Sequence, residues 1–212
     1  MSLSRPRRFA PSLALFVAGA LGFLLVAPQA AEAQVSTTRG WSFGLYLQGS
    51  ALTVENSDPG GGGGGGLRVG YGINRTVTLF VRGDGSQTDV EDASIEGQWT
   101  LGHGEVGARF HFANSLRRVV PFLEVAAGAR AVTVDAARID GEDQDESITF
   151  NGGAFSVGGG MGVYFNESWA LDMGLAWTSG EFTEIEAGPI TLGGLDIDAT
   201  SFRFNLGVVW WP

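Results

Sequence analysis

The last fourteen residues, 199–212, alternate between large apolar side chains and small or polar ones. A period of two is typical of a β-strand with one apolar face. That face consists of five large side chains: Phe202, Phe204, Leu206, Val208 and Trp210. The opposite face carries a charge in mid-strand, Arg203. A strand that turns its apolar face to lipid and its small, polar face to a lumen has this pattern, so the segment predicts a membrane strand.

The same alternation recurs along the chain and predicts eight strands. Their ranges are 41–48, 67–73, 77–82, 95–112, 122–130, 155–165, 169–178 and 199–212. In the fourth strand, Trp99 and Leu101 are out of phase with Val106 and Phe110. We therefore expect a β-bulge near residues 102–104, because one extra residue in a strand reverses the phase of its two faces.

The predicted connections alternate between long and short. The long ones are 54–66, 83–94, 135–147 and 180–198, and the short ones are 74–75, 113–118 and 166–168. This rhythm is typical of an outer-membrane barrel with long extracellular loops and short periplasmic turns. We therefore predict an all-β fold, an eight-stranded antiparallel up-and-down transmembrane β-barrel with both termini in the periplasm. Aromatic residues near strand ends are expected to form its two interfacial girdles: Trp41, Trp99, Phe112, Phe165, Trp169, Trp177, Trp210 and Trp211.

The first 33 residues have the composition of a signal peptide. Three arginines precede an apolar run at 13–26, and Ala31-Glu32-Ala33 provides the small residues that a signal peptidase reads. A run of this length is short of the ~20 residues that a spanning helix needs, which argues against a retained anchor. We expect residues 1–33 to be removed and residues 34–212 to form the barrel domain.

Composition narrows the classes of function. The chain has a formal net charge of -10 and no Cys. An acidic balance argues against nucleic-acid binding, which requires clustered Arg or Lys. Glycine is abundant, with 34 residues, and residues 60–66 are all glycine. This run lacks the Lys-Ser/Thr ending of a phosphate loop, so we expect a flexible loop or a glycine-lined beginning of the second strand.

Three stretches resemble a known family. They are Leu67-Arg-Val-Gly-Tyr-Gly-Ile, Pro121-Phe-Leu-Glu-Val-Ala-Ala-Gly-Ala and the aromatic end. With the leader and the loop rhythm, the chain resembles the small eight-stranded outer-membrane barrels that include the transmembrane domain of outer membrane protein A. The resemblance implies the outer membrane of a Gram-negative-type envelope, surrounding lipid as partner, and no cofactor. It also implies that the barrel-assembly machinery reads the C-terminal strand. Members usually end on Phe, whereas this chain ends Trp210-Trp211-Pro212.

The expected lumen face collects charges of both signs. Its members are Arg68, Arg82, Glu105, Arg109, Glu124, Arg130, Asp172 and Arg203. Unpaired charges in a narrow interior are costly, so they should pair. Neighbouring strands would bring Glu105 and Arg109 to Glu124, and Asp172 to Arg203. The cluster would either gate a narrow pore or simply fill the barrel, as is normal for eight strands.

We therefore expect a structural or porin-like barrel without enzymatic activity, with acidic loops outside. A surface adhesion barrel remains an alternative with an unknown ligand. The acidic stretch 140–146 lacks the spacing of a calcium loop, so no metal site is expected. A lipid A-modifying enzyme would need a nucleophile beside His103 or His111, and the sequence does not indicate one. A soluble lipocalin-like barrel would carry its charges outside, the reverse of the pattern here.

Overall fold

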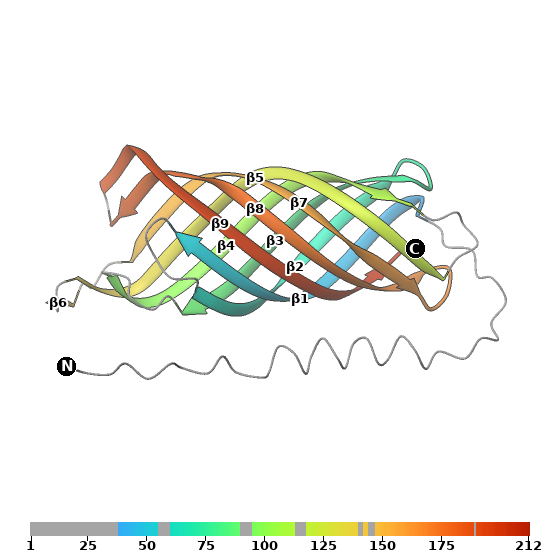
Figure 1. Ribbon diagram of the computed structural model, residues 1–212, viewed down its shortest axis with the longest axis horizontal. Coiled ribbons are helices and arrows are strands. Elements are labelled where there is room, and N and C mark those ends of the chain that lie inside the picture. The colour runs from blue at the N-terminus through green and yellow to red at the C-terminus, as the bar shows by residue number, and fades with distance from the viewer. Residues whose placement is uncertain are drawn as a thin grey trace, which may run out of the picture. The chain divides into compact units, whose positions relative to one another are not determined.

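The computed structural model describes residues 38–54, 60–89, 95–112, 118–139, 142–143, 147–188 and 190–212. The predicted signal peptide lies outside these ranges. The described residues form an antiparallel β-barrel with strongly tilted strands (Figure 1). The strands are β1 (Gly40–Val54), β2 (Gly60–Gly72), β3 (Val77–Asp89), β4 (Ile95–His111), β5 (Val119–Ile139), β6 (Glu142–Asp143), β7 (Ile148–Tyr164), β8 (Trp169–Ala187) and β9 (Ile190–Trp210).

Eight strands make the wall. Each pairs with its neighbour in chain order, and β1 pairs with β9 to close the cylinder. The short β6 pairs only with the end of β5. The predicted eight-stranded up-and-down barrel is therefore confirmed. Among the described residues, no helix is long and apolar enough to cross a membrane.

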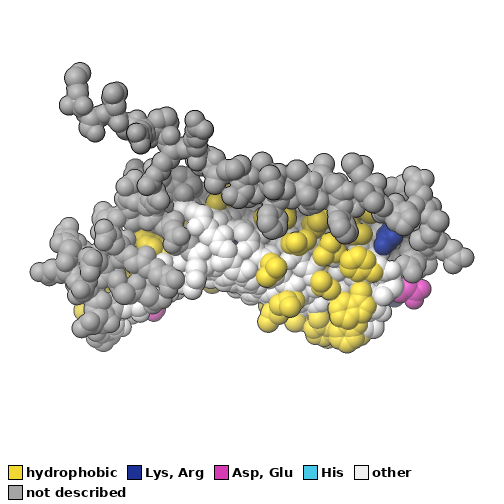
Figure 2. Space-filling view, turned by 90° about the horizontal axis from the view of Figure 1, so that it is seen from below, with side chains coloured by type: hydrophobic (Ala, Val, Ile, Leu, Met, Phe, Trp, Pro, Cys, Tyr) yellow, Lys and Arg dark blue, Asp and Glu magenta, His cyan; other side chains and the backbone are white. Residues whose placement is uncertain are grey.

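The two faces of the wall follow the predicted alternation. In β1, Trp41 and Leu45 are exposed on the outside, whereas Ser42 and Tyr46 are buried in the interior. The same holds in β9, where Phe204 faces out and Arg203 faces in. Outward-facing hydrophobic side chains gather towards one end of the barrel, and a stretch without them follows (Figure 2). The apolar outer band matches the lipid-facing surface of a membrane barrel.

Two short turns lie at the end of the barrel where β1 begins and β9 ends, which we call the short-turn end (Figure 1). In the first turn, the Asn74 side chain accepts hydrogen bonds from the backbone N–H groups of Thr76 and Val77. Asn166 does the same for Ser168 and Trp169 in the second. Backbone hydrogen bonds from Ile73 to Val77 and from Phe165 to Trp169 also close these turns, and the Asn side chain adds to them.

At the opposite end, the strands extend much further than predicted. The wall strands have 13 to 21 residues, whereas the sequence patterns indicated about ten. Large parts of the predicted long loops are therefore paired strand, including most of 180–198, which forms the β8–β9 hairpin. The glycine run is also strand: residues 60–66 pair with β1 on one side, and residues 61–66 pair with β3 on the other. Of the two readings of that run, the beginning of the second strand is the one observed.

One glycine of this run is required by close approach of the backbone. A Cβ at Gly64 would lie 1.9 Å from the carbonyl oxygen of Gly85 on β3. Its neighbour Gly63 faces outwards, where a Cβ would approach only Gln48, at 3.7 Å. The inward glycines therefore let β2 curve tightly over β3, which a larger side chain would prevent.

The predicted bulge at residues 102–104 is absent, which is a correction. Pairing of β4 with β3 and β5 runs through this stretch without a break, and the register shifts only between Glu96 and Gln98. Trp99 and Leu101 are apolar at positions that face into the barrel, whereas the apolar residues Val106 and Phe110 face outwards. At this end of the barrel the interior is apolar. The apolar residues of β4 therefore lie on its inward face here and on its outward face further along, without any bulge in the strand.

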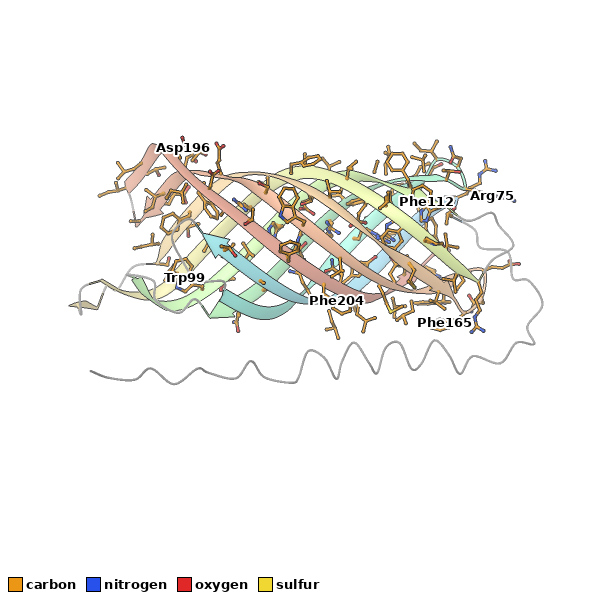
Figure 3. The ribbon with its side chains drawn as sticks, in the orientation of Figure 1. Arg75, Trp99, Phe112, Phe165, Asp196 and Phe204 are labelled. Atoms are coloured by element: carbon orange, nitrogen blue, oxygen red, sulfur yellow. The ribbon has the colours of Figure 1, made fainter. Side chains whose placement is uncertain are left out.

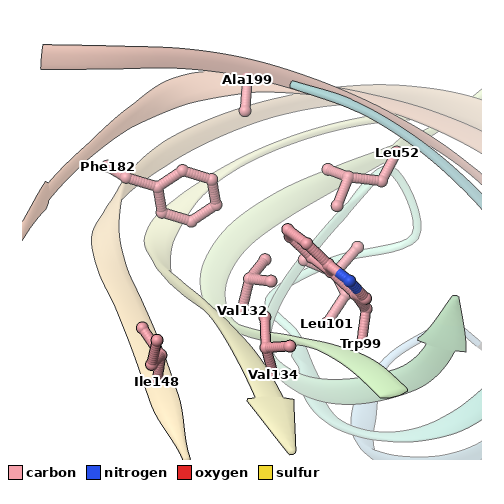
Figure 4. Close-up of a cluster of buried hydrophobic side chains, with 8 residues drawn as sticks. All are labelled: Leu52, Trp99, Leu101, Val132, Val134, Ile148, Phe182 and Ala199. Carbon is pink, nitrogen blue, oxygen red and sulfur yellow. The ribbon is translucent and has the colours of Figure 1, made fainter. Parts of the chain in front are cut away.

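Apolar side chains close the interior at both ends. At the end opposite the short turns lies the apolar plug (Figure 4), formed by Leu52, Trp99, Leu101, Val132, Val134, Ile148, Phe182 and Ala199. Near the short turns lies the C-terminal cluster, formed by Tyr46, Val120, Tyr164, Ala170, Val209 and Trp211. Trp99 and Trp211 were expected in the outer girdles, and both are instead buried inside. Phe112 and Phe165 lie at the short-turn end and are exposed, as a girdle requires (Figure 3).

Candidate functional site

The eight charged residues predicted for the lumen all lie in the interior and are buried. Seven of them, together with Asp84, form what we call the lumen network: Arg68, Arg82, Arg109, Arg203, Asp84, Glu105, Glu124 and Asp172. Arg130 is not part of this network and bonds backbone carbonyls instead. The network lies between the apolar plug and the C-terminal cluster.

Three adjacent strands supply the first half of the network. Arg82 is the register partner of Glu105, and Arg109 is the register partner of Glu124. The Arg82 guanidinium spans both acids, with Nη2 2.5 Å from Glu105 Oε2 and Nη1 2.7 Å from Glu124 Oε1. Arg109 Nη2 lies 3.0 Å from Glu124 Oε2, which is the pairing that the sequence suggested. Alternating signs on neighbouring strands thus neutralise one another.

Asp172 on β8 accepts hydrogen bonds from residues on other strands that reach into the lumen. Arg109 Nη1 donates to Asp172 Oδ2, and Arg68 Nη2 lies 3.2 Å from the same oxygen. Tyr46 also donates its hydroxyl hydrogen to it, at 3.2 Å. The expected pair of Asp172 with Arg203 is absent. The register explains why: Asp172 lies opposite Gly207, four residues along β9 from Arg203.

Arg203 on β9 instead reaches across the barrel. Its Nη1 lies 2.7 Å from Asp84 Oδ2, and its Nη2 lies 2.6 Å from Glu105 Oε1. Nη2 also donates to the hydroxyls of Ser156 and Thr178. Sequence reasoning missed Asp84 because it placed residue 84 in a loop. The signal was present, since Asp84 follows Arg82 at the spacing that keeps both on one face.

Aromatic rings share the interior with the charges. The Arg109 guanidinium carbon lies 3.5 Å from the centroid of the Phe122 ring, and Arg68 lies over Tyr46 at 5.2 Å. Such cation–π contacts contribute most where water is excluded. They leave little room: the cavity beside the network has space for about one or two water molecules. The amide of Gln48 borders this cavity and has no protein partner.

The two histidines lie inside as well, without the arrangement of a hydrolase. His103 Nδ1 lies 3.1 Å from Asp84 Oδ1, which is the contact that orients a catalytic base. Its other nitrogen has no partner among the described residues, so no nucleophile is paired with it. His111 Nε2 lies 3.1 Å from Thr78 Oγ1, and both side chains are buried at the short-turn end. Within the described ranges, no group of three or more acidic, His or Cys side chains could hold a metal ion.

Comparison with solved structures shows the same fold in bacterial surface proteins. Neisserial surface protein A matches with a TM-score of 0.59 at 15% identity, covering 81% of this chain and 96% of that one. Ail, the attachment invasion locus protein of Yersinia pestis, matches with a TM-score of 0.51 at 12% identity, covering 81% of this chain and 99% of that one. At these identities the similarity concerns the fold. No curated protein sequence matches the chain significantly.

A family model provides the assignment that these structures alone do not. The model of the outer membrane protein beta-barrel domain matches residues 16–209. The match covers β1 to β8 and all but the last residue of β9, with the apolar outer band and the charged interior. The chain therefore belongs to the family of outer-membrane β-barrel domains.

Proposed function

We propose that this chain is a closed barrel that serves the outer membrane structurally and displays its acidic end outside the cell. The observation that carries the proposal is the filled lumen. Ion pairs occupy its middle, and apolar side chains occupy both ends. An ion crossing it would have to break buried pairs and also pass the apolar plug, and both steps are costly.

The same proposal fixes the orientation. The short turns and both ends of the barrel chain would face the periplasm, and the β8–β9 hairpin would stand outside. Exposed acids lie on that hairpin, among them Glu181, Glu184 and Glu186. Asp196 is another, at the end of the barrel opposite the short turns (Figure 3). A cleaved leader at residues 1–33 and recognition of the last strand by the barrel-assembly machinery belong to this proposal. Trp210 supports the latter, since it faces outwards at the end of β9.

Conductance in a planar lipid bilayer tests the proposal. The refolded barrel should be silent, with heat-modifiable gel migration proving that it is folded. A double variant, Leu52→Ser with Leu101→Ser, should raise the frequency of discrete openings, because hydroxyls would hydrate the apolar plug. The matched control, Leu45→Ser, changes an outward-facing leucine and should stay silent. Steady conductance by the unaltered barrel would contradict the closed lumen and favour a porin-like role.

Surface adhesion is the second candidate. It is favoured by wall strands that continue beyond the apolar outer band and by the shared fold with the attachment protein Ail. Replacing Glu181, Glu184 and Glu186 by Gln would leave the barrel folded and should reduce attachment of bacteria to host cells if the hairpin binds. Unchanged attachment would contradict adhesion by the hairpin and would leave the structural role as the only proposed function. The proposal includes no catalytic step.

A further inference from the structure

Arg130 is the one arginine buried in the described interior that contacts no carboxylate. The lumen network pairs four arginines with four acids, so its charges balance. Arg130 adds a fifth positive charge, and only 2% of its surface is exposed. The charge of Asp198 on β9 acts on Arg130, but Asp198 is exposed and forms no ion pair with it. A buried charge without a paired counter-charge is expensive.

The contacts of Arg130 leave most of its hydrogens unused. Nη2 donates to two backbone oxygens, that of Gly180 and, at 2.8 Å, that of Ala199. The guanidinium lies over the Phe182 ring, 4.5 Å from its centroid. Nε and Nη1 are buried and have no hydrogen-bond partner in the part of the chain that the structure describes. Since a guanidinium carries five N–H donors, three remain unsatisfied.

The surroundings of Arg130 contain further polar groups without a partner among the described residues. His103 is its register partner on β4 and faces inwards, and the Nε2 atom of His103 has no partner. On β9, Ser201 follows Ala199 on the inward face, and its hydroxyl is also unpaired. The next inward residue, Arg203, leaves its Nε unpaired. These groups are nitrogens and a hydroxyl, not acids.

We propose that a small monovalent anion such as chloride binds at Arg130, between the apolar plug and the lumen network. It would accept hydrogen bonds from Nε and Nη1 and place a negative charge beside a guanidinium that pairs with no carboxylate among the described residues. The Ser201 hydroxyl can turn to donate a further bond. The His103 ring would contribute only when protonated, because Nδ1 is already engaged with Asp84.

The test measures the unfolding equilibrium of the barrel in urea at constant ionic strength, with sodium chloride replacing sodium gluconate. A ligand that binds only the folded state lowers the unfolding constant by the factor 1 + [L]/Kd, so above Kd each tenfold rise in chloride should lower it about tenfold. The variant Arg130→Gln should lose this response. The control Arg118→Gln removes an exposed arginine at the short-turn end and should keep it.

Bromide provides a direct second measurement that does not depend on folding of the variant. Crystals of the unaltered protein soaked in sodium bromide should show an anomalous peak within hydrogen-bond distance of Arg130 Nε or Nη1. Superimposable curves in chloride and gluconate would overturn the proposal. So would an undiminished chloride response in Arg130→Gln, or bromide bound only elsewhere.

Discussion

Arg203 on β9 and Glu105 on β4 are joined across the lumen, with 2.6 Å between Nη2 and Oε1, although 98 residues separate them in the chain. Glu105 accepts from Arg82 and Ser156 as well. Glu105 on β4 therefore links its own strand both to the neighbouring β3 and, across the lumen, to β9.

Replacing Glu105 by Ala should lower the free energy of unfolding by about 3–5 kcal/mol, because it removes one of the acid partners of two buried guanidinium groups, Arg82 and Arg203. Urea unfolding in lipid vesicles measures this change. Glu181→Ala is the matched control, since Glu181 is exposed on the outer face, and its effect should stay within about 0.5 kcal/mol. Equal losses in the two variants would show that the lumen network contributes little to stability.

The outer band predicts a depth-dependent cost of charge on β9. Leu206 lies midway between Phe202 and Trp210 on the outward face, so Leu206→Arg should cost about 2–4 kcal/mol. Thr200 is on the same face of the same strand but beyond the band, and Thr200→Arg should cost about 0–1 kcal/mol. Urea unfolding in lipid vesicles measures the free energy of unfolding of both variants. A larger cost at Thr200 than at Leu206 would misplace the membrane along the barrel.

Two adjacent glycines of β2 should respond in opposite ways to Ala. Gly64→Ala places a methyl group 1.9 Å from a carbonyl oxygen and should cost about 1–3 kcal/mol. Gly63→Ala makes only an ordinary contact, with the Gln48 carbonyl oxygen at 3.7 Å, and should stabilise by about 0.4–1 kcal/mol, because it reduces the freedom of the unfolded chain. The midpoint of heat-modifiable gel migration gives the order of the two. Similar losses at both sites would mean that both faces of the strand are packed.

Period-two alternation made much of this fold predictable. It placed Arg82, Glu105, Arg109 and Glu124 on the inward face and made the last two neighbours, because antiparallel strands joined by a short turn have a restricted register. What it could not supply was distance across the lumen. Whether Arg203 pairs with Asp172 or with Asp84 and Glu105 depends on the reach of its side chain and on the curvature of the barrel.

The remaining errors have a common cause. The interior changes from polar to apolar along the barrel axis, while the outside changes from apolar to small and polar. Trp99 and Leu101 keep the phase of their strand, but their hydrophobicity suggested the wrong face. If one assumes that each strand has a single apolar face, a strand whose apolar residues move from the outward to the inward face is mistaken for one that contains a bulge or ends in a loop. It therefore shortened β8 and β9 and left the strand formed by residues 60–66 as one of two alternatives.

Labelling of single cysteines tests this exchange of faces most directly, since the chain has none of its own. Three variants suffice: Leu101→Cys in the apolar plug, Leu206→Cys in the outer band and Thr200→Cys beyond it. In vesicles, a water-soluble maleimide should label only Thr200→Cys, and a lipid-borne quencher should reach only a fluorophore installed at residue 206. Leu101→Cys should react only after unfolding. Rapid labelling of Leu101→Cys in the folded barrel, or protection of Thr200→Cys by lipid, would contradict the account.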